Sequence, residues 1–231
     1  MSAESDAHSF RHQGYLLLEG FHPPKRIAPI RRRLQHALDM LERNRRAAQS
    51  LRGLPVFQQI GKLSPLVQVP GLHHALVTPE LLDVITALGG HSPSTVQETQ
   101  LLLSPPGQGR WTLERLNWHV DVTARRQERP PGIQAFFLLD TMAPHGGATL
   151  ALAGSHRGAA RRTASGLALR EVLSRGGDLE RALRELDIAL VEMTGQAGDV
   201  YLMDMRLLHS PSVNASRRVR LMATCRCFLE A

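Results

Sequence analysis

The feature that most constrains this fold is a run of short apolar segments that begins after Ser94. These segments are "TVQETQLLLS", "RLNWHVDV", "IQAFFLLDTM", "ATLALAG", "IALVEMT", "GDVYLMDM" and "RLMATCRCFL". Turn signals rich in glycine and proline, such as "PPGQG", "APHGGA" and "GQAGD", separate them. Short strands punctuated by such turns predict a β-sandwich or a barrel in this half of the chain.

Helical patterns precede these segments and interrupt them once. Apolar residues recur at spacings of three and four over residues 27–41, which predicts an amphipathic helix with Pro29 in its first turn. The stretch "TPELLDVITALGG" predicts a second helix, with Thr78 as its cap and Gly90 at its end. A helical insert of about residues 166–187 lies between the fourth and the fifth predicted strands.

Helices followed by strands indicate an α+β chain. The 231 residues, 42% of them hydrophobic, are enough for one good-sized core, so we expect a single domain over 1–231. Residues 1–93 form its mainly helical part. Residues 94–231 form a jelly-roll core, a double-stranded β-helix of the cupin-like kind, with the N-terminal and inserted helices packed around it.

Composition argues against membrane and nucleic-acid partners. No run of about 18 apolar residues occurs, and "MSAESDAHSF" lacks the apolar core of a signal peptide, so we expect a cytoplasmic protein. The net charge is +7, but the arginine clusters are scattered and aromatic residues make up only 4%, too few for base stacking. Cys225 and Cys227 are expected to be ordinary strand residues, because a disulfide between such close neighbours would be strained.

The segment "NWHVD" places two chemically active side chains on a predicted strand. Residues two apart on a strand point to the same face, so His119 and Asp121 converge while Trp118 and Val120 face the other way. This pair alone fits a structural hydrogen bond as well as a metal site.

His209 and Arg220 favour a metal site over a structural hydrogen bond. His209 follows an apolar strand, and two histidines with one carboxylate are the ligand set of non-haem Fe(II) oxygenases. Arg220 comes eleven residues later, where a guanidinium would bind a dicarboxylate through two parallel hydrogen bonds.

Taken together, the motifs resemble the Fe(II)/2-oxoglutarate-dependent phytanoyl-CoA dioxygenase family. The resemblance runs nearly end to end, through "FRHQGYLLLEGFHPP", "LLLSPPGQG", "NWHVD", "GGATLALAGSHRG" and "GDVYLMDMRLLHSPSVNASRRVR". It implies Fe(II), 2-oxoglutarate and O2 as cofactor and co-substrates, with succinate and CO2 as products. It also implies roles for six residues: His119, Asp121 and His209 as iron ligands, Arg220 as the partner of the distal carboxylate of 2-oxoglutarate, and Thr149 and Gln100 as further contacts of that co-substrate.

Several positions depart from the family pattern. Gly146 replaces the usual Asn, Ala153 a proline and Met203 a phenylalanine; these changes concern turns and packing. Asp121 is the informative position, because the resemblance implies that Ala or Gly there would open a coordination site for chloride. The chain is therefore expected to be an oxygenase and not a halogenase.

The substrate prediction depends on polar residues near the motif. Gln97 and Asn117 are expected to contact the substrate, and the candidate lid segments, 49–71 and 125–132, contain arginine and glutamine but few aromatic residues. We expect hydroxylation or oxidative cyclisation of a small polar metabolite in natural-product biosynthesis, with sugar-containing compounds among the candidates. The alternative is a non-catalytic jelly-roll binding protein, against which the intact motif and Arg220 argue.

Overall fold

The computed structural model describes residues 3–43, 54–114, 116–123, 129–157, 169–175 and 179–229. Its helices are α1 (Ala3–Gln13), α2 (Pro24–Arg43), α4 (Val56–Leu63), α5 (Leu72–Leu76), α6 (Pro79–Gly89), α7 (Leu169–Arg175) and α8 (Leu179–Glu185), with 3-10 turns η1 (Ser64–Leu66) and η2 (Ser155–Arg157). Its strands are β1 (Tyr15–Leu18), β2 (Thr95–Val96), β3 (Gln100–Ser104), β4 (Gly132–Leu138), β5 (Thr149–Ala153), β6 (Ala189–Glu192), β7 (Val200–Asp204), β8 (His209–Pro211) and β9 (Arg220–Phe228).

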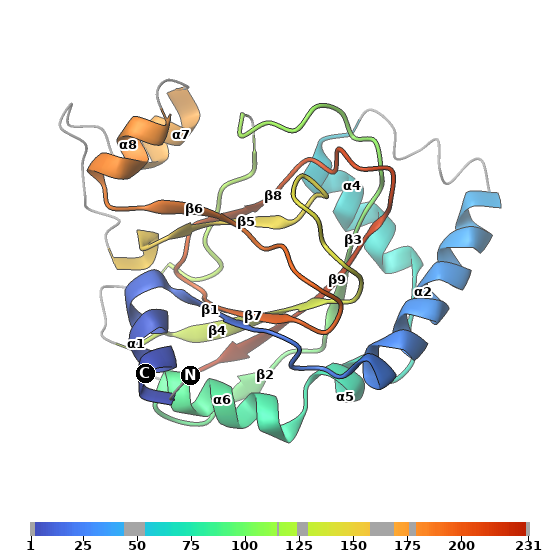
Figure 1. The fold of residues 1–231 in the computed structure, drawn as a ribbon, viewed down its shortest axis with the longest axis horizontal. Helices are drawn as coiled ribbons and strands as arrows, with labels where there is room; N and C mark the ends of the chain where they lie inside the picture. The colour runs from blue at the N-terminus through green and yellow to red at the C-terminus, as the bar shows by residue number, and fades with distance from the viewer. Residues whose placement is uncertain are drawn as a thin grey trace.

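The strands form two antiparallel sheets that face each other (Figure 1). The major sheet has the order β1-β7-β4-β9-β2, with β3 also paired to β9, and the minor sheet has the order β6-β5-β8. Strands that are distant in the sequence are therefore neighbours, as in β1 with β7 and β4 with β9. This arrangement confirms the predicted α+β fold with a jelly-roll core.

The outer face of the major sheet carries the largest core. Alternate residues of β4, β7 and β9 pack there against apolar residues of α1, α2, α5 and α6. Phe137 on β4, Leu34 on α2 and Ile85 on α6 are all fully buried in this cluster. The helical part of the chain thus stabilises the sheet from the side opposite to the minor sheet (Figure 1).

A second core fills the space between the two sheets. This cluster includes Phe136, Tyr201, Met203 and Met222 of the major sheet and Ala151 of the minor sheet. A third, smaller cluster joins α7 and α8 to the far side of the minor sheet. The interior between the sheets is therefore the place where side chains of both sheets can meet.

One edge of the major sheet is covered by a helix. Ile60 and Leu63 of α4 are buried, and the Leu103 N–H of β3 donates a hydrogen bond to Ser64 Oγ at 2.9 Å. Within the candidate lid 49–71, the residues from 54 onward thus include an ordered helix; 49–53 lie outside the described residues. Of the second candidate lid, 125–128 lie outside them too, and β4 begins at Gly132.

Three expectations about local structure need correction. Helix α2 begins at Pro24, so Pro29 lies inside it, where its nitrogen cannot donate a hydrogen bond to the Lys25 carbonyl. The segment "TVQETQLLLS" is divided into β2 and β3, and "RLNWHVDV" is not a strand beyond a single bridge at His119. Strand β8 was not predicted because it has only three residues.

Other expectations are confirmed. Thr78 caps α6 by accepting a hydrogen bond from Leu81 N, and Gly90 ends this helix with a left-handed φ of +83°. Cys225 and Cys227 are free and buried on β9. The described part of the insert 166–187 is helical, as α7 and α8. None of the helices in the described residues is long and apolar enough to cross a membrane.

Candidate metal and co-substrate site

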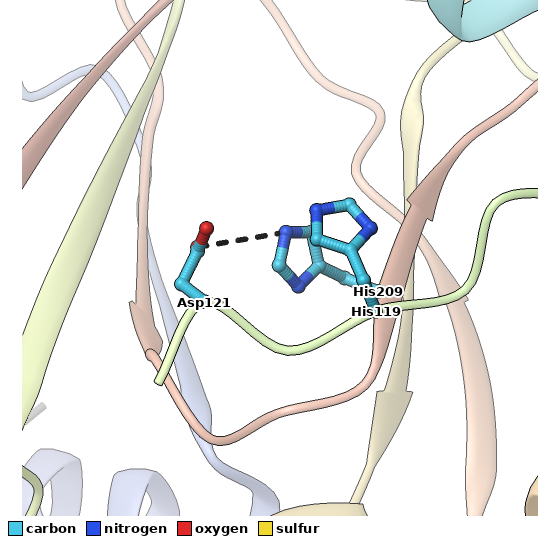
Figure 2. A group of neighbouring side chains, drawn as sticks. All are labelled: His119, Asp121 and His209. Atoms are coloured by element: carbon cyan, nitrogen blue, oxygen red, sulfur yellow. Dashed lines mark ion pairs between the residues drawn. The ribbon is translucent and has the colours of Figure 1, made fainter. Parts of the chain in front are cut away.

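His119 and His209 lie opposite each other although 90 residues separate them in the chain. Their backbones form an isolated antiparallel bridge, with both N–H···O distances at 2.9 Å. His209 is also paired with Ala151 of β5, and its side chain is on the face that looks into the interior between the sheets. The two imidazole rings come within 4.2 Å of each other, measured between centroids (Figure 2).

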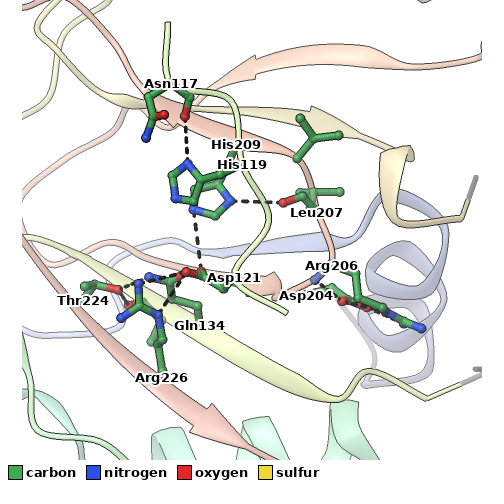
Figure 3. A network of polar contacts seen from close by, with 12 residues as sticks. Asn117, His119, Asp121, Gln134, Asp204, Arg206, Leu207, His209, Thr224 and Arg226 are labelled. Atoms are coloured by element: carbon green, nitrogen blue, oxygen red, sulfur yellow. Dashed lines mark hydrogen bonds and ion pairs between the residues drawn. The ribbon is translucent and has the colours of Figure 1, made fainter. Parts of the chain in front are cut away.

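Each histidine has one ring nitrogen fixed by a backbone carbonyl. The Nδ1 of His119 is 2.8 Å from Asn117 O, and the Nδ1 of His209 is 3.1 Å from Leu207 O (Figure 3). Because a carbonyl oxygen only accepts, both Nδ1 atoms donate, which leaves the lone pair of each Nε2 free. Burial, with a further contribution from His119, lowers the pKa of His209 to about 4, so that this ring is a neutral potential ligand at neutral pH.

Asp121 completes the group with two carboxylate oxygens in different environments. Its Oδ1 accepts hydrogen bonds from Nε and Nη2 of Arg226, at 3.2 and 2.9 Å. Its Oδ2 is buried, has no hydrogen-bond partner in the described parts of the chain, and lies 3.7 Å from Nε2 of His209 (Figure 2). An unsatisfied buried oxygen is costly, so this atom is suited to a ligand that the protein itself does not provide.

These three side chains fit a metal ion. One ligand atom from each of His119, Asp121 and His209 lies within 4.8 Å of the others, and among the described residues this is the group of His, Cys, Asp and Glu with metal-binding spacing. Two imidazole nitrogens and one carboxylate oxygen are the donor set of a facial triad, which suits Fe(II) and leaves coordination positions open.

Arg220 is a buried cation without an anionic partner. It is the first residue of β9, only 3% exposed, and its Nη1 donates to the Gly147 carbonyl. Its Nε is buried without a partner, and none of the described carboxylates forms an ion pair with it. Burial lowers its pKa to about 10, which still leaves it charged at neutral pH. A buried, unpaired guanidinium is suited to an anionic ligand such as a carboxylate.

The turn around Gly147 supports the hydrogen bond between Arg220 Nη1 and the Gly147 carbonyl. Gly147 has a φ of +81°, and a Cβ there would lie 2.7 Å from Cβ of Asn214. Asn214 in turn donates to the carbonyls of Ser104 and Arg218, at 3.2 and 2.8 Å. These contacts hold the loop that leads into Arg220.

The other two expected co-substrate contacts lie on strands that face the same interior. Thr149 is buried on β5, two residues after Gly147 and on the same strand face as Ala151. Gln100 is in register with Thr224 of β9, so it lies nearer to Arg226, which binds Asp121, than to Arg220. The side chain of Gln100 is exposed. Their roles toward the co-substrate remain predictions.

The two expected substrate contacts, Gln97 and Asn117, have exposed side chains, and their roles toward a substrate remain predictions. Because "RLNWHVDV" is not a regular strand, Asn117 does not share a strand face with His119; its side chain is exposed, and its carbonyl fixes the His119 ring. Trp118 and Val120 do point away from the site, into the cluster on the far side of the minor sheet. The side chain of Gln97 is exposed, while its backbone N–H and carbonyl bind β9.

The sequence reasoning missed Arg226 and the polar pair beside it. Gln134, 2% exposed, donates from Nε2 to Thr224 Oγ1 at 2.9 Å, and its buried Oε1 has no hydrogen-bond partner among the described residues (Figure 3). The signal was present in "RLMATCRCF", because strand alternation places Thr224 and Arg226 on the same face as Arg220. Arg217 and Arg218 are exposed, as expected for solvated residues.

Comparisons with known proteins identify the family and the fold. The model of the phytanoyl-CoA dioxygenase (PhyH) family matches residues 10–222. No curated protein sequence matches the chain. Among solved structures, AviO1 from Streptomyces viridochromogenes Tue57 is 19% identical with a TM-score of 0.61, covering 100% of this chain and 96% of its own.

Two further structures share the fold. SnoK, a non-haem alpha-ketoglutarate-dependent carbocyclase from nogalamycin biosynthesis, is 18% identical with a TM-score of 0.61, covering 99% of this chain and 86% of its own. EctD from S. alaskensis, solved with 2-oxoglutarate and 5-hydroxyectoine, is 22% identical with a TM-score of 0.62, covering 99% and 76%. With nearly the whole length matched by the family model, the chain belongs to the phytanoyl-CoA dioxygenase family of iron- and 2-oxoglutarate-dependent oxygenases.

Proposed function

We propose that His119, Asp121 and His209 hold Fe(II), that Arg220 binds the distal carboxylate of 2-oxoglutarate, and that the enzyme oxidises a C–H bond of a small polar metabolite. The observation that carries this proposal is the placement of three metal-ligand atoms and one buried, unpaired guanidinium in the interior between the same two sheets. Iron bound there, together with 2-oxoglutarate and O2, would supply the oxidant while the co-substrate is converted to succinate and CO2.

The residues of the chain contribute orientation and exclusion of water. The carbonyls of Asn117 and Leu207 hold the two imidazole rings with Nε2 directed at the metal position. Arg220 offers its planar donor group to a carboxylate, with Thr149 as the proposed hydroxyl donor beside it. Phe136, 2% exposed, lies with its ring 6.2 Å from that of His209 and helps to keep water out of the site.

A polar substrate is supported by the wall formed by Gln134, Thr224 and Arg226. Gln134 Oε1 is a buried acceptor that lacks a donor, and Arg226 is a cation whose side chain is 29% exposed. An apolar ligand would leave the Gln134 Oε1 acceptor unpaired, at a cost of about 1–3 kcal/mol. The structural relatives from nogalamycin biosynthesis and the EctD complex support a role in the tailoring of small molecules, with sugar-containing compounds as candidates.

Succinate formation is the test of this proposal. The full chain is incubated with Fe(II), ascorbate and 2-oxoglutarate, first alone and then with a mixed panel of hydroxyl-rich, zwitterionic and long-chain acyl-CoA compounds. We expect slow succinate release without substrate and faster release with polar compounds. Absence of succinate in every arm would favour a binding protein, whereas the greatest stimulation by an acyl-CoA would refute the polar pocket and keep the iron chemistry.

A further inference from the structure

Arg226 of the major sheet binds the side chain of Asp121. The Asp121 segment has few backbone bonds of its own: besides the bridge at His119, the N–H groups of Asp121 and Val122 both donate to Met205 O. Arg226, by contrast, belongs to the long strand β9 and is in register with Gln134 of β4. The guanidinium, itself held by the sheet, therefore restricts the movement of a carboxylate that lies on an irregular segment.

The contact is selective for one oxygen. Arg226 donates from Nε and Nη2 to Oδ1, whereas Oδ2 has no hydrogen-bond partner among the described residues and is directed toward Nε2 of His209 (Figure 3). The side chain of Asp121 is 8% exposed, so water is not a ready substitute for either partner. The guanidinium thus fixes the rotation of the carboxylate about its terminal bond.

This contact parallels those of the two histidines. His119 is oriented by the Asn117 carbonyl, His209 by the Leu207 carbonyl and Asp121 by Arg226. Partners of this kind determine how a metal ligand points, and their loss typically costs about 10- to 100-fold in metal affinity or activity.

We propose that Arg226 is a positioning residue that holds Asp121 through Oδ1, so that Oδ2 is the oxygen offered to the metal. The proposal rests on the proposed assignment of Asp121 as a metal ligand. Orientation and charge make opposite predictions here, because a cation near a metal site repels the metal ion. If orientation dominates, removal of Arg226 weakens metal binding; if charge dominates, removal strengthens it.

The test is titration of Co(II), a spectroscopic substitute for Fe(II), into the metal-free full chain. Visible absorption and calorimetry are measured for the wild type, Arg226→Met, Arg226→Lys and Asp121→Ala. We expect about 10- to 100-fold weaker binding and an altered Co(II) spectrum for Arg226→Met. Arg226→Lys, which keeps the charge but not the forked geometry, is expected to weaken binding less and to show a spectrum between the two.

Arg31→Met is the matched control, because Arg31 pairs with Asp140 at 3.1 Å on the helical side of the molecule. It is expected to bind Co(II) like the wild type. Equal or tighter binding by Arg226→Met would overturn the proposal, and if that variant does not fold by circular dichroism, unchanged binding by Arg226→Lys overturns it. A wild type that does not bind Co(II), or an Asp121→Ala variant that binds it normally, would instead refute the ligand assignment itself.

Discussion

The two faces of β9 differ in almost every physical respect. Toward the minor sheet it presents Arg220, Thr224 and Arg226, charged or polar side chains that contact other polar groups. Toward the helices it presents Cys225, Cys227 and other small or apolar residues that belong to the largest core. The alternation of a strand thus assigns neighbouring residues to different tasks.

The difference indicates that stability and activity are separable in this protein. The outer face gains free energy from apolar area removed from water, whereas the inner face contains buried charges whose placement costs free energy unless a partner or ligand pairs with them. Variants of the outer face should therefore alter unfolding alone, whereas variants of the inner face should alter turnover as well. The following predictions test that separation, beginning with the largest expected effect.

Replacement of an inner-face metal ligand gives the largest expected effect. Asp121→Ala removes Oδ2 and should abolish succinate formation, while circular dichroism and thermal unfolding of the metal-free protein stay close to the wild type, because Asp121 lies outside the apolar clusters. A variant that keeps most of its activity would contradict the iron assignment.

Phe137 and Phe136 are adjacent on β4 and form a matched pair. Phe137 is fully buried on the outer face and Phe136 is 2% exposed on the inner face. Each change to Ala should reduce the free energy of unfolding by about 3–5 kcal/mol in urea titrations. Turnover per folded molecule should fall only for Phe136→Ala, whose ring lies near His209. Equal loss of turnover in both variants would show that the two faces are not separable.

His22 makes the outer side sensitive to acid. Burial, with a contribution from Arg26, lowers the pKa of His22 to about 4, so the folded protein resists a proton that the unfolded chain takes up near pH 6.5. His22 therefore does not change the free energy of unfolding above about pH 6.5. As the pH drops from there toward 4, the free energy of unfolding falls, by about 2 kcal/mol at pH 5 from this histidine. Urea titrations at about pH 7 and pH 5 should show the loss, and His22→Leu should reduce it. An unchanged loss in that variant would assign the effect to other buried histidines, because burial also lowers the pKa values of His156 and His209.

Arg220→Lys, the last of the four, is expected to alter co-substrate binding and not stability. The ammonium replaces two parallel donors by a point charge, a difference of about 1.5–3 kcal/mol, or about 10- to 150-fold in the 2-oxoglutarate requirement. The KM for 2-oxoglutarate is the measurement, with Co(II) affinity as a control that should not change. An unchanged KM would indicate that another cation binds the co-substrate.

The sequence predicted most of the fold because its signals are local. The alternation and length of β4, β5, β7 and β9, and the capping of α6 by Thr78, depend on neighbouring residues only. Strand β8 and the irregular "NWHVD" segment depend on tertiary contacts instead: their backbones are paired with each other and with Met205. No local pattern distinguishes such a segment from a strand.

The candidate site was predictable to a similar extent. The spacing of His119, Asp121, His209 and Arg220 follows a known motif, and the structure brings the first three together. Arg226 is different, because its contact with Asp121 depends on two segments 105 residues apart in the sequence. Arginine is common in this chain, so its residue type alone gives no indication of which arginine faces the site.

The helix that covers β3 also has a consequence for aggregation. An uncovered strand with the sequence "QLLLS" would offer free backbone groups and apolar side chains to a second molecule, which is how edge strands initiate intermolecular sheets. The Leu103 N–H donates its hydrogen bond to Ser64 Oγ, and α4 lies over this edge. Proteolytic removal or local opening of α4 should therefore produce insoluble oligomers before the two sheets themselves unfold.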